Sequence, residues 1–314
     1  QYTHNVLVPG SNPGGPTKHQ IISVYMSNIF AMVTTKSSNL YTDYAIKSFF
    51  KNTDFSEDDE FLLIDNENNN LDNFSSYKKI KIIKNKNILS FSENVNQVIK
   101  IAKKDNKNLV FLNNDIIFTK SWFVALKENS DSVSIPVNNQ LFFYKTNCGN
   151  LVLKPTMNLK DFNEKYSLLD EIVEQHKKKF KPNQKIQAPL MPFFCFKLPN
   201  NIMNDVGYFD ESFVVGAEDV DYRIRCAKKG HEVNFLLDSF VLHFHGKSTW
   251  DGNETPEETR ERDKNYTEAF RKKWGKNLTE LFIERKNFST ILKDDQEREL
   301  FKKGKFGELI RKIL

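Results

Sequence analysis

The 314-residue chain has no apolar run near the ~18 residues of a membrane span, so we expect no transmembrane helix. It has few cysteines, and the three present, Cys148, Cys195 and Cys226, are scattered and form no Cys-x-x-Cys pair. This usage indicates a reduced, cytoplasmic protein with free thiols. The first twenty residues are polar and rich in Gly and Pro, so we expect no signal peptide. No internal repeat is visible.

The net charge of +5 is not evenly spread. Residues 255–314 hold 16 Lys and Arg against 12 Asp and Glu, a net of +4, which leaves the body close to neutral. A neutral body argues against nucleic acid as a partner. It suits a small anionic ligand held by a few dedicated groups.

Short apolar runs alternate with helical patterns, which predicts an α/β fold with a mostly parallel sheet covered by helices on both faces. Residues 1–27 are interpreted as a loose arm because they are rich in Pro and Gly. The predicted strands contain residues 30–33, 61–64, 80–83 and 109–112. The predicted helices carry the apolar sets Tyr41, Tyr44, Ala45, Phe49 and Val95, Val98, Ile99, Ala102.

Polar residues follow three of these strands: Thr34-Thr35, Asp65-Asn66 and Asn113-Asn114-Asp115. Each could be a turn, since Asn and Asp favour turns. Ligands of open α/β sheets bind beyond the carboxyl ends of the strands, so the three together favour a polar ligand site. Asp115 is the natural oxygen ligand for Mg²⁺ or Mn²⁺ there.

A second acidic group lies in residues 216–225, where the apolar spacing predicts a helix ended by Gly230. Glu218 and Asp219 fall in its first turn, where the helix dipole should depress their pKa and keep them ionised. The alternative is a charged surface helix, with the i,i+4 pairs Asp219–Arg223 and Asp221–Arg225.

Six segments carry a resemblance to a known family: Asn96–Ala102, Leu112-Asn113-Asn114-Asp115, Val206–Phe213, Glu218–Gly230, Val241–Ser248 and Lys273-Trp274-Gly275. Together they resemble the family 2 glycosyltransferases of the GT-A fold, in its rhamnosyl- and galactosyltransferase-like members. Val98 stands where the family's helix usually has Gly, and Asn113 stands where its Asp-x-Asp motif has the first Asp. The match covers roughly residues 28–275.

The resemblance implies an inverting, metal-dependent transfer of a sugar from a nucleotide-diphosphate-sugar, with a UDP-sugar favoured, to a hydroxyl group. Asp115 would bind Mn²⁺ or Mg²⁺, helped by His243 or His245, which alternate along a strand and so share a face. Asp219 would be the general base and Glu218 would orient the acceptor. The residues expected to bind the nucleotide-sugar are Thr34, Thr35, Asp65, Asn96, Asn113, Asn114, Asp115 and Arg225.

The expected organisation is a catalytic domain over residues 28–250, followed by a helical basic extension over 251–314. Within the domain, residues 28–133 form the nucleotide-binding half and 134–250 the acceptor-binding half. The acceptor is a glycan, a lipid-linked molecule or a protein. We expect the apolar face of the last helix to fold back on its own domain; the alternatives are that it lies on an anionic membrane surface or docks a partner. Two rival functions are a catalytically silent nucleotide-sugar- or glycan-binding protein and a nucleotidyltransferase.

Overall fold

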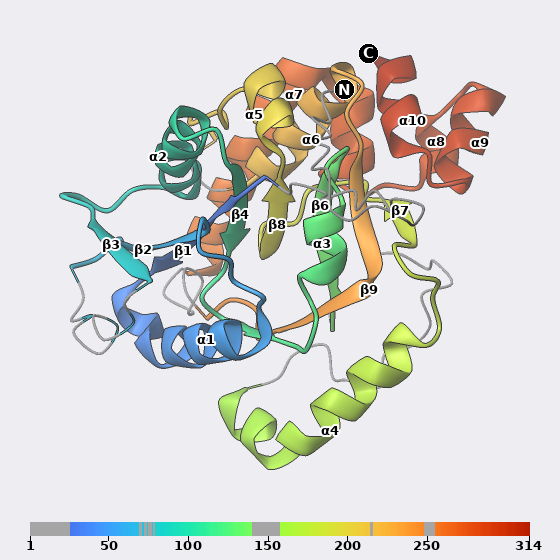
Figure 1. The fold of residues 1–314 in the computed structure, drawn as a ribbon. Helices are drawn as coiled ribbons and strands as arrows, with labels where there is room; N and C mark the ends of the chain where they lie inside the picture. The colour runs from blue at the N-terminus through green and yellow to red at the C-terminus, as the bar shows by residue number, and fades with distance from the viewer. Residues whose placement is uncertain are drawn as a thin grey trace, which may run out of the picture.

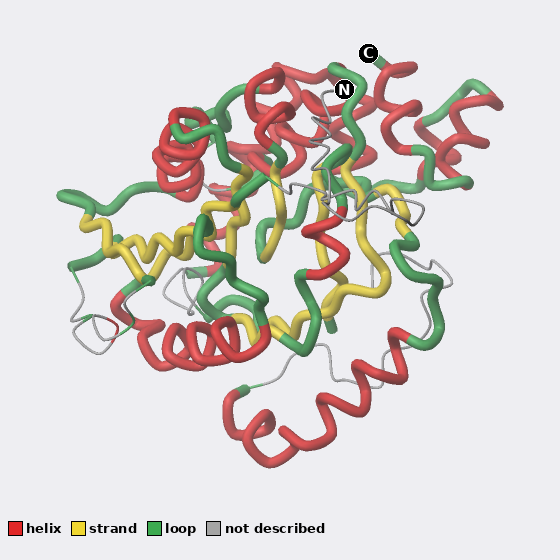
Figure 2. The backbone as a smooth tube through the Cα atoms, in the orientation of Figure 1, coloured by secondary structure: helices red, strands yellow, loops and turns green. Residues whose placement is uncertain are grey.

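A nine-stranded mixed sheet forms the centre of the molecule, and helices cover both of its sides (Figures 1 and 2). The structure is a computed structural model that describes residues 26–68, 71, 74, 77, 79–139, 158–213, 216–247 and 255–314. The predicted arm, residues 1–27, falls almost entirely outside these ranges. No helix of the described residues is long and apolar enough to cross a membrane.

The sheet order is β3-β2-β1-β4-β8-β6-β9-β5, with β7 paired to β9. The four strands from β3 to β4 pair in parallel, whereas β8 is antiparallel to both β4 and β6. The strands are β1 (Asn28–Thr34), β2 (Glu60–Asp65), β3 (Ile80–Lys84), β4 (Asn108–Leu112), β5 (Ile116–Phe118), β6 (Val133–Asn138), β7 (Lys185–Gln187), β8 (Cys195–Leu198) and β9 (Val233–His243).

The parallel half forms as the apolar runs predict, because β1 and β4 are buried on both faces. Figure 1 shows α1 and α4 on one side of the sheet and α2, α5 and α6 on the other. The helices are α1 (Asn39–Asn52), α2 (Phe91–Lys104), α3 (Val124–Glu128), α4 (Leu159–Lys177), α5 (Asn200–Val206), α6 (Glu218–Lys228), α7 (Pro256–Phe282), α8 (Phe288–Ile291), α9 (Asp295–Lys302) and α10 (Phe306–Ile313), with a short 3-10 helix at Lys36–Ser38.

The C-terminal helices α7 to α10 gather against α6 and share a second apolar core with it (Figure 1). Val220, Ile224 and Ala227 project from α6 into this core, while Leu309 and Ile310 of α10 are fully buried in it. This confirms the prediction that the apolar face of the last helix folds back on its own chain. Burial of that face supplies the hydrophobic stabilisation that a short basic helix lacks by itself.

Candidate functional site

The polar residues predicted to meet at one edge of the sheet do so in the structure. Thr34 and Asp65 are register partners at the ends of β1 and β2, and both are fully buried. β1 also pairs with β4, whose last residue precedes Asn113. The peptide N–H of Asn113 donates to the carbonyl of Phe194 at 2.7 Å, which carries the edge on to the antiparallel half of the sheet.

Three of these predicted ligand-binding side chains, Thr34, Thr35 and Asn114, are linked through the hydroxyl groups of Ser38 and Thr42. The amide Nδ2 of Asn114 donates to Ser38 Oγ at 2.6 Å and to Thr42 Oγ1 at 3.0 Å. Thr42 Oγ1 in turn lies 2.9 Å from Thr34 Oγ1, and Thr35 Oγ1 lies 2.8 Å from Ser38 Oγ. This network fixes the start of α1 against the end of β4. Contacts of Thr34, Thr35, Asp65, Asn113 and Asn114 with a nucleotide remain predictions.

Asp115 and His243 form the most specific pair at this edge. His243 ends β9, opposite Ile116 of β5, and its Nε2 donates to Asp115 Oδ1 at 3.1 Å across 128 residues of sequence. The peptide N–H of Lys247 donates to the other oxygen, Oδ2, at 3.2 Å. Asp115 is 1% exposed and His243 6%. Burial raises the pKa of Asp115, but the charge and hydrogen bond of His243 outweigh it, and the pKa lies below its ordinary value.

His243 and His245 differ in their settings, although the sequence placed them on one strand face. β9 ends at His243, and His245 follows with a positive φ of 66° and an exposed side chain. Their rings lie 5.6 Å apart at 85°. The chain turns between them, so the strand alternation that predicted a shared face does not extend to His245. Of the two, His243 is the one in contact with Asp115.

The Asp115–His243 pair fits part of the coordination shell of a divalent cation. Two cis ligands of an octahedral ion, each about 2.1 Å from it, lie about 3.0 Å apart, close to the observed separation. The buried Nδ1 of His243 has no hydrogen-bond partner within the described part of the chain. No cluster of three or more His, Cys, Asp or Glu side chains among the described residues is arranged to hold an ion. Phosphate oxygens and water would complete the shell, as is usual for Mg²⁺.

Two residues that the sequence reasoning did not assign support His243. The side chain of Asn139 accepts from the His243 N–H at 2.8 Å and donates to its carbonyl at 3.1 Å. The ring of Phe194 stacks on the imidazole at 5.3 Å. An Asn near a strand end gives no sequence signal for this role. Phe194 immediately precedes β8 and is buried.

The second acidic group lies at the start of α6, as predicted, but its electrostatics are the reverse of the prediction. Burial, followed by the charge of Asp219, raises the pKa of Glu218 to about 7. Burial likewise raises the pKa of Asp219 to about 6. The hydrogen bond from the N–H of Val220 and the charge of Arg285 act in the opposite direction but do not cancel this rise. Desolvation therefore exceeds the effect of the helix dipole that the sequence reasoning relied on. One oxygen of Glu218, Oε2, is buried without a hydrogen-bond partner among the described residues.

The alternative interpretation of α6 as a charged surface helix is wrong for Asp221 and Arg223, which are both fully buried. The pair Asp221–Arg225 does form, with Arg225 Nε donating to Asp221 Oδ2 at 2.9 Å. Arg225 also donates to the carbonyl of Val206 at 3.1 Å. Asn96 of α2 likewise bonds to the loop before α6, through both backbone groups of Phe209 and the side chain of Glu211. Direct nucleotide-sugar contacts of Arg225 and Asn96 remain predictions.

Aromatic contacts on either side of the Phe193–Phe194 peptide bond lie between the two acidic groups. The ring of Phe194 stacks on His243. The preceding residue, Phe193, has its ring centroid 5.3 Å from that of Phe209. Phe209 stacks on Tyr222 of α6 at 4.1 Å. Tyr222 lies one helical turn from Glu218 and Asp219. Rigid packing thus relates the metal-binding candidates to the carboxylate pair.

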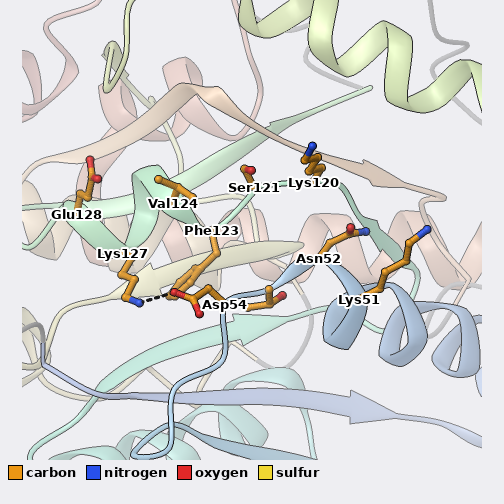
Figure 3. Close-up of a pocket in the computed structure, with 10 residues that line it drawn as sticks. Lys51, Asn52, Asp54, Lys120, Ser121, Phe123, Val124, Lys127 and Glu128 are labelled. Carbon is orange, nitrogen blue, oxygen red and sulfur yellow. Dashed lines mark hydrogen bonds and ion pairs between the residues drawn. The ribbon is translucent and has the colours of Figure 1, made fainter.

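A cavity of about 490 Å³ lies elsewhere, at the opposite end of α1 from Ser38 (Figure 3). Figure 3 shows Lys127 turned toward Asp54, with which it forms an ion pair of 3.0 Å. Lys51 and Lys120 also line the cavity. None of the predicted site residues lines it, so we do not assign the proposed chemistry to this cavity.

Glu218→Gln should raise the free energy of unfolding at pH 8 by roughly 1–3 kcal/mol and change it little at pH 4. The native pKa of Glu218 is raised from 4.5 to about 7. Between these values the native state binds more protons than the unfolded state, so stability falls as pH rises toward 7. Glutamine cannot ionise, so the variant does not lose this stability as the pH rises. Urea unfolding at both pH values measures the free energy of unfolding, with Glu261→Gln, at an exposed position, as control. If Glu218→Gln unfolds at pH 8 with the same free energy as the wild type, the pKa of Glu218 is not raised.

Comparisons with known proteins give information on the fold of this chain. No family model and no curated protein sequence matches the chain. Among solved structures, GalNAc-T7 with UDP, GalNAc and Mn²⁺ is similar over 90% of this chain, at a TM-score of 0.55 and 12% identity. This chain matches 59% of that one, so it spans about three fifths of its length. The structure of S. aureus TarS 1–349 has a TM-score of 0.49 and 12% identity, over 87% of this chain and 77% of that one. The mannosyltransferase PcManGT of Pyrobaculum calidifontis, in complex with GDP-Man and Mn²⁺, has a TM-score of 0.47 and 9% identity, over 91% of this chain and 86% of that one.

The predicted fold class is confirmed: an α/β sheet of the GT-A type, flanked by helices and followed by a helical C-terminal region. At this level of identity the likeness shows the fold alone. A fold hosts many activities, so function has to be argued from the site.

Proposed function

We propose that this protein is a metal-dependent, inverting glycosyltransferase that moves a sugar from a nucleotide-diphosphate-sugar to an acceptor hydroxyl group. The observation that carries the proposal is the buried Asp115–His243 pair at the carboxyl edge of the sheet. In open α/β folds this edge is where nucleotides bind. The neighbour GalNAc-T7, whose structure contains UDP, GalNAc and Mn²⁺, supports the same ligand classes.

Asp115 and His243 would hold a divalent cation, and the Mn²⁺ in the structure of GalNAc-T7 favours manganese. Such an ion stabilises the negative charge that develops on a nucleoside-diphosphate leaving group. Positive charge beside Asp115 lowers its pKa, and a bound cation would take over that place from the proton of His243, whose imidazole has to be neutral to act as a ligand. Asn113, in place of a second carboxylate, leaves the ion fewer charged protein ligands and gives the diphosphate a larger share of its coordination.

Asp219 would accept the proton of the acceptor hydroxyl as its oxygen attacks the anomeric carbon opposite the leaving group. A pKa of about 6 leaves most of this carboxylate ionised at pH 7, yet makes it a stronger base than an ordinary Asp. Glu218, with a pKa of about 7 and an unpartnered Oε2, would hydrogen-bond to the acceptor in either protonation state. The rest of the acceptor site is proposed to lie in residues 134–250.

We expect Mn²⁺-dependent binding and slow hydrolysis of one donor class when the protein is incubated with a panel of nucleotide-diphosphate-sugars. Water then replaces the missing acceptor, and release of nucleoside diphosphate measures the reaction. Heat-treated protein and EDTA-treated protein serve as controls. Donor binding without any turnover would identify a silent binding protein. Release of pyrophosphate from a nucleoside triphosphate and a sugar phosphate would identify a nucleotidyltransferase.

A further inference from the structure

Asp221 is a buried carboxylate in the first turn of α6, and it receives hydrogen bonds and ion pairs from three charged or polar donors. Arg225 Nε reaches Oδ2 at 2.9 Å, while Lys273 Nζ and Trp274 Nε1 reach Oδ1 at 2.6 and 2.8 Å. A fully buried carboxylate is stable only with such partners. Two of the three come from α7, in the C-terminal segment.

Lys273 does more than neutralise Asp221. Its ammonium also pairs with Asp210 at 2.5 Å and lies over the rings of Phe213 and Trp274, 5.3 and 5.4 Å from their centroids. Asp210 and Phe213 belong to the loop that leads into α6. Lys273 therefore holds this loop, the helix and α7 together. We call Asp221, Arg225, Lys273 and Trp274 the Asp221 clamp.

The C-terminal segment also contacts the turn that precedes the carboxylate pair. A Cβ added to Gly216 would lie 2.6 Å from a ring carbon of Tyr266, so the α7 tyrosine rests directly on this backbone. Gly216 has φ +106° and Ala217 φ +69°, both in the left-handed region, and Glu218 begins the helix. The close approach and the positive φ both require glycine at position 216. The turn before Glu218 is thus confined by α7.

Packing makes this arrangement stiff. One side of α6 packs on the sheet core through Tyr222 and Cys226, and the other on the second core through Val220 and Ile224. The clamp therefore holds the first turn of α6 at Asp221, and Tyr266 confines the backbone just before that turn at Gly216.

We infer that the C-terminal segment, residues 255–314, is a positioning element whose Asp221 clamp fixes the first turn of α6 and so the placement of Glu218 and Asp219. This inference rests on the proposed function for its catalytic meaning. Lys273 and Trp274 are positioning residues, because they act through Asp221 and not on substrate. A reacting carboxylate displaced by 1 Å costs about 10²-fold in rate, so such support has a measurable effect.

The first test measures the first turn of α6 directly, by amide hydrogen exchange of residues 216–222. Trp274→Phe removes one N–H donor but leaves Lys273 and Arg225 on Asp221, so the variant should fold. A hydrogen bond to a charged group is worth about 1.5–3 kcal/mol, and its loss should speed exchange in this segment about tenfold or more. Exchange in β4 and β9 should not change. Lys276→Met is the control on α7, because the ammonium of Lys276 is exposed and its ion pair with Glu280 is long, at 4.0 Å.

The second test separates placement from binding by steady-state kinetics. Lys273→Met and Trp274→Phe should lower kcat by about 10- to 10²-fold while the donor KM and the Mn²⁺ dependence stay near wild type. Lys273→Arg, which keeps the charge, should recover most of the rate.

Unchanged exchange in Trp274→Phe overturns the inference, and so does faster exchange with an unchanged kcat. If Lys273→Met does not fold, Trp274→Phe decides the question. A wild-type protein that transfers no sugar refutes the proposed function, and the exchange experiment then decides the clamp by itself.

Discussion

Asp219→Asn is expected to lower sugar transfer by ~10²–10⁴-fold while donor affinity stays near wild type. The substitution keeps the size of the side chain but removes the proton acceptor. Asp219 lies in the first turn of α6, apart from the Asp115–His243 pair, and its described contacts include neither residue. Initial rates with saturating donor, beside calorimetry of the nucleoside diphosphate with Mn²⁺, separate the two effects.

The pH profile sharpens this prediction. In the wild type kcat should rise with pH through about 6, because Asp219 must lose its proton before it can act as a base. In Asp219→Asn this limb should disappear. Glu218→Gln should instead raise the KM for acceptor. Asp205→Asn, an exposed carboxylate paired with Lys229 and His231, is the control and should retain normal rates. Near-normal turnover in Asp219→Asn would move the base to another residue.

The parallel half of the fold could be predicted because its signals are local. Runs such as Phe61–Ile64 are apolar at every position, and the strands they form are buried on both faces. Their polar ends meet at one edge because parallel strands end together, as Thr34 and Asp65 do. The antiparallel insertion of β8 between β4 and β6 gives no such signal, since its pairing depends on residues far apart in the chain.

Residue types could be placed in the site more readily than their environments. Glu218 and Asp219 start a helix as predicted, but the sequence does not show that C-terminal helices cover the opposite side of α6, so it predicted a pKa shift of the wrong sign. The same burial converts Asp221 from a predicted surface charge into the centre of a clamp. Desolvation depends on the whole tertiary structure, whereas a helix dipole can be inferred from one segment.

The Asp115–His243 pair, our proposed metal site, could be predicted only in part, for the same reason. Asp115 follows a clear strand, so its place at the sheet edge was evident from the sequence. The choice between His243 and His245 depended on where β9 ends, and strand ends are the least certain part of a sequence prediction. The positive φ of His245 settles where the strand geometry stops.

Asp115→Ala is expected to abolish metal-dependent donor binding while leaving a folded protein. Its carboxylate is the one acidic ligand proposed for the ion, and its removal leaves His243 Nε2 and the Lys247 N–H without their acceptor. Those losses should lower the free energy of unfolding by about 1–3 kcal/mol, which a domain of this size tolerates. Calorimetry of the nucleoside diphosphate with and without Mn²⁺ measures the effect.

His243→Ala should weaken the same Mn²⁺-dependent binding without abolishing it, because Asp115 supplies the charge and the imidazole only a second ligand. His245→Ala should have a smaller effect, since this exposed side chain has no described contact with Asp115 beyond its neighbouring charge. Asp105→Ala removes an exposed carboxylate at the end of α2, and this variant should bind as the wild type does.

If Asp115→Ala retains the wild-type affinity and its dependence on Mn²⁺, the ion is held elsewhere. The Asp115–His243 pair is then a structural contact between β9 and the residue before β5.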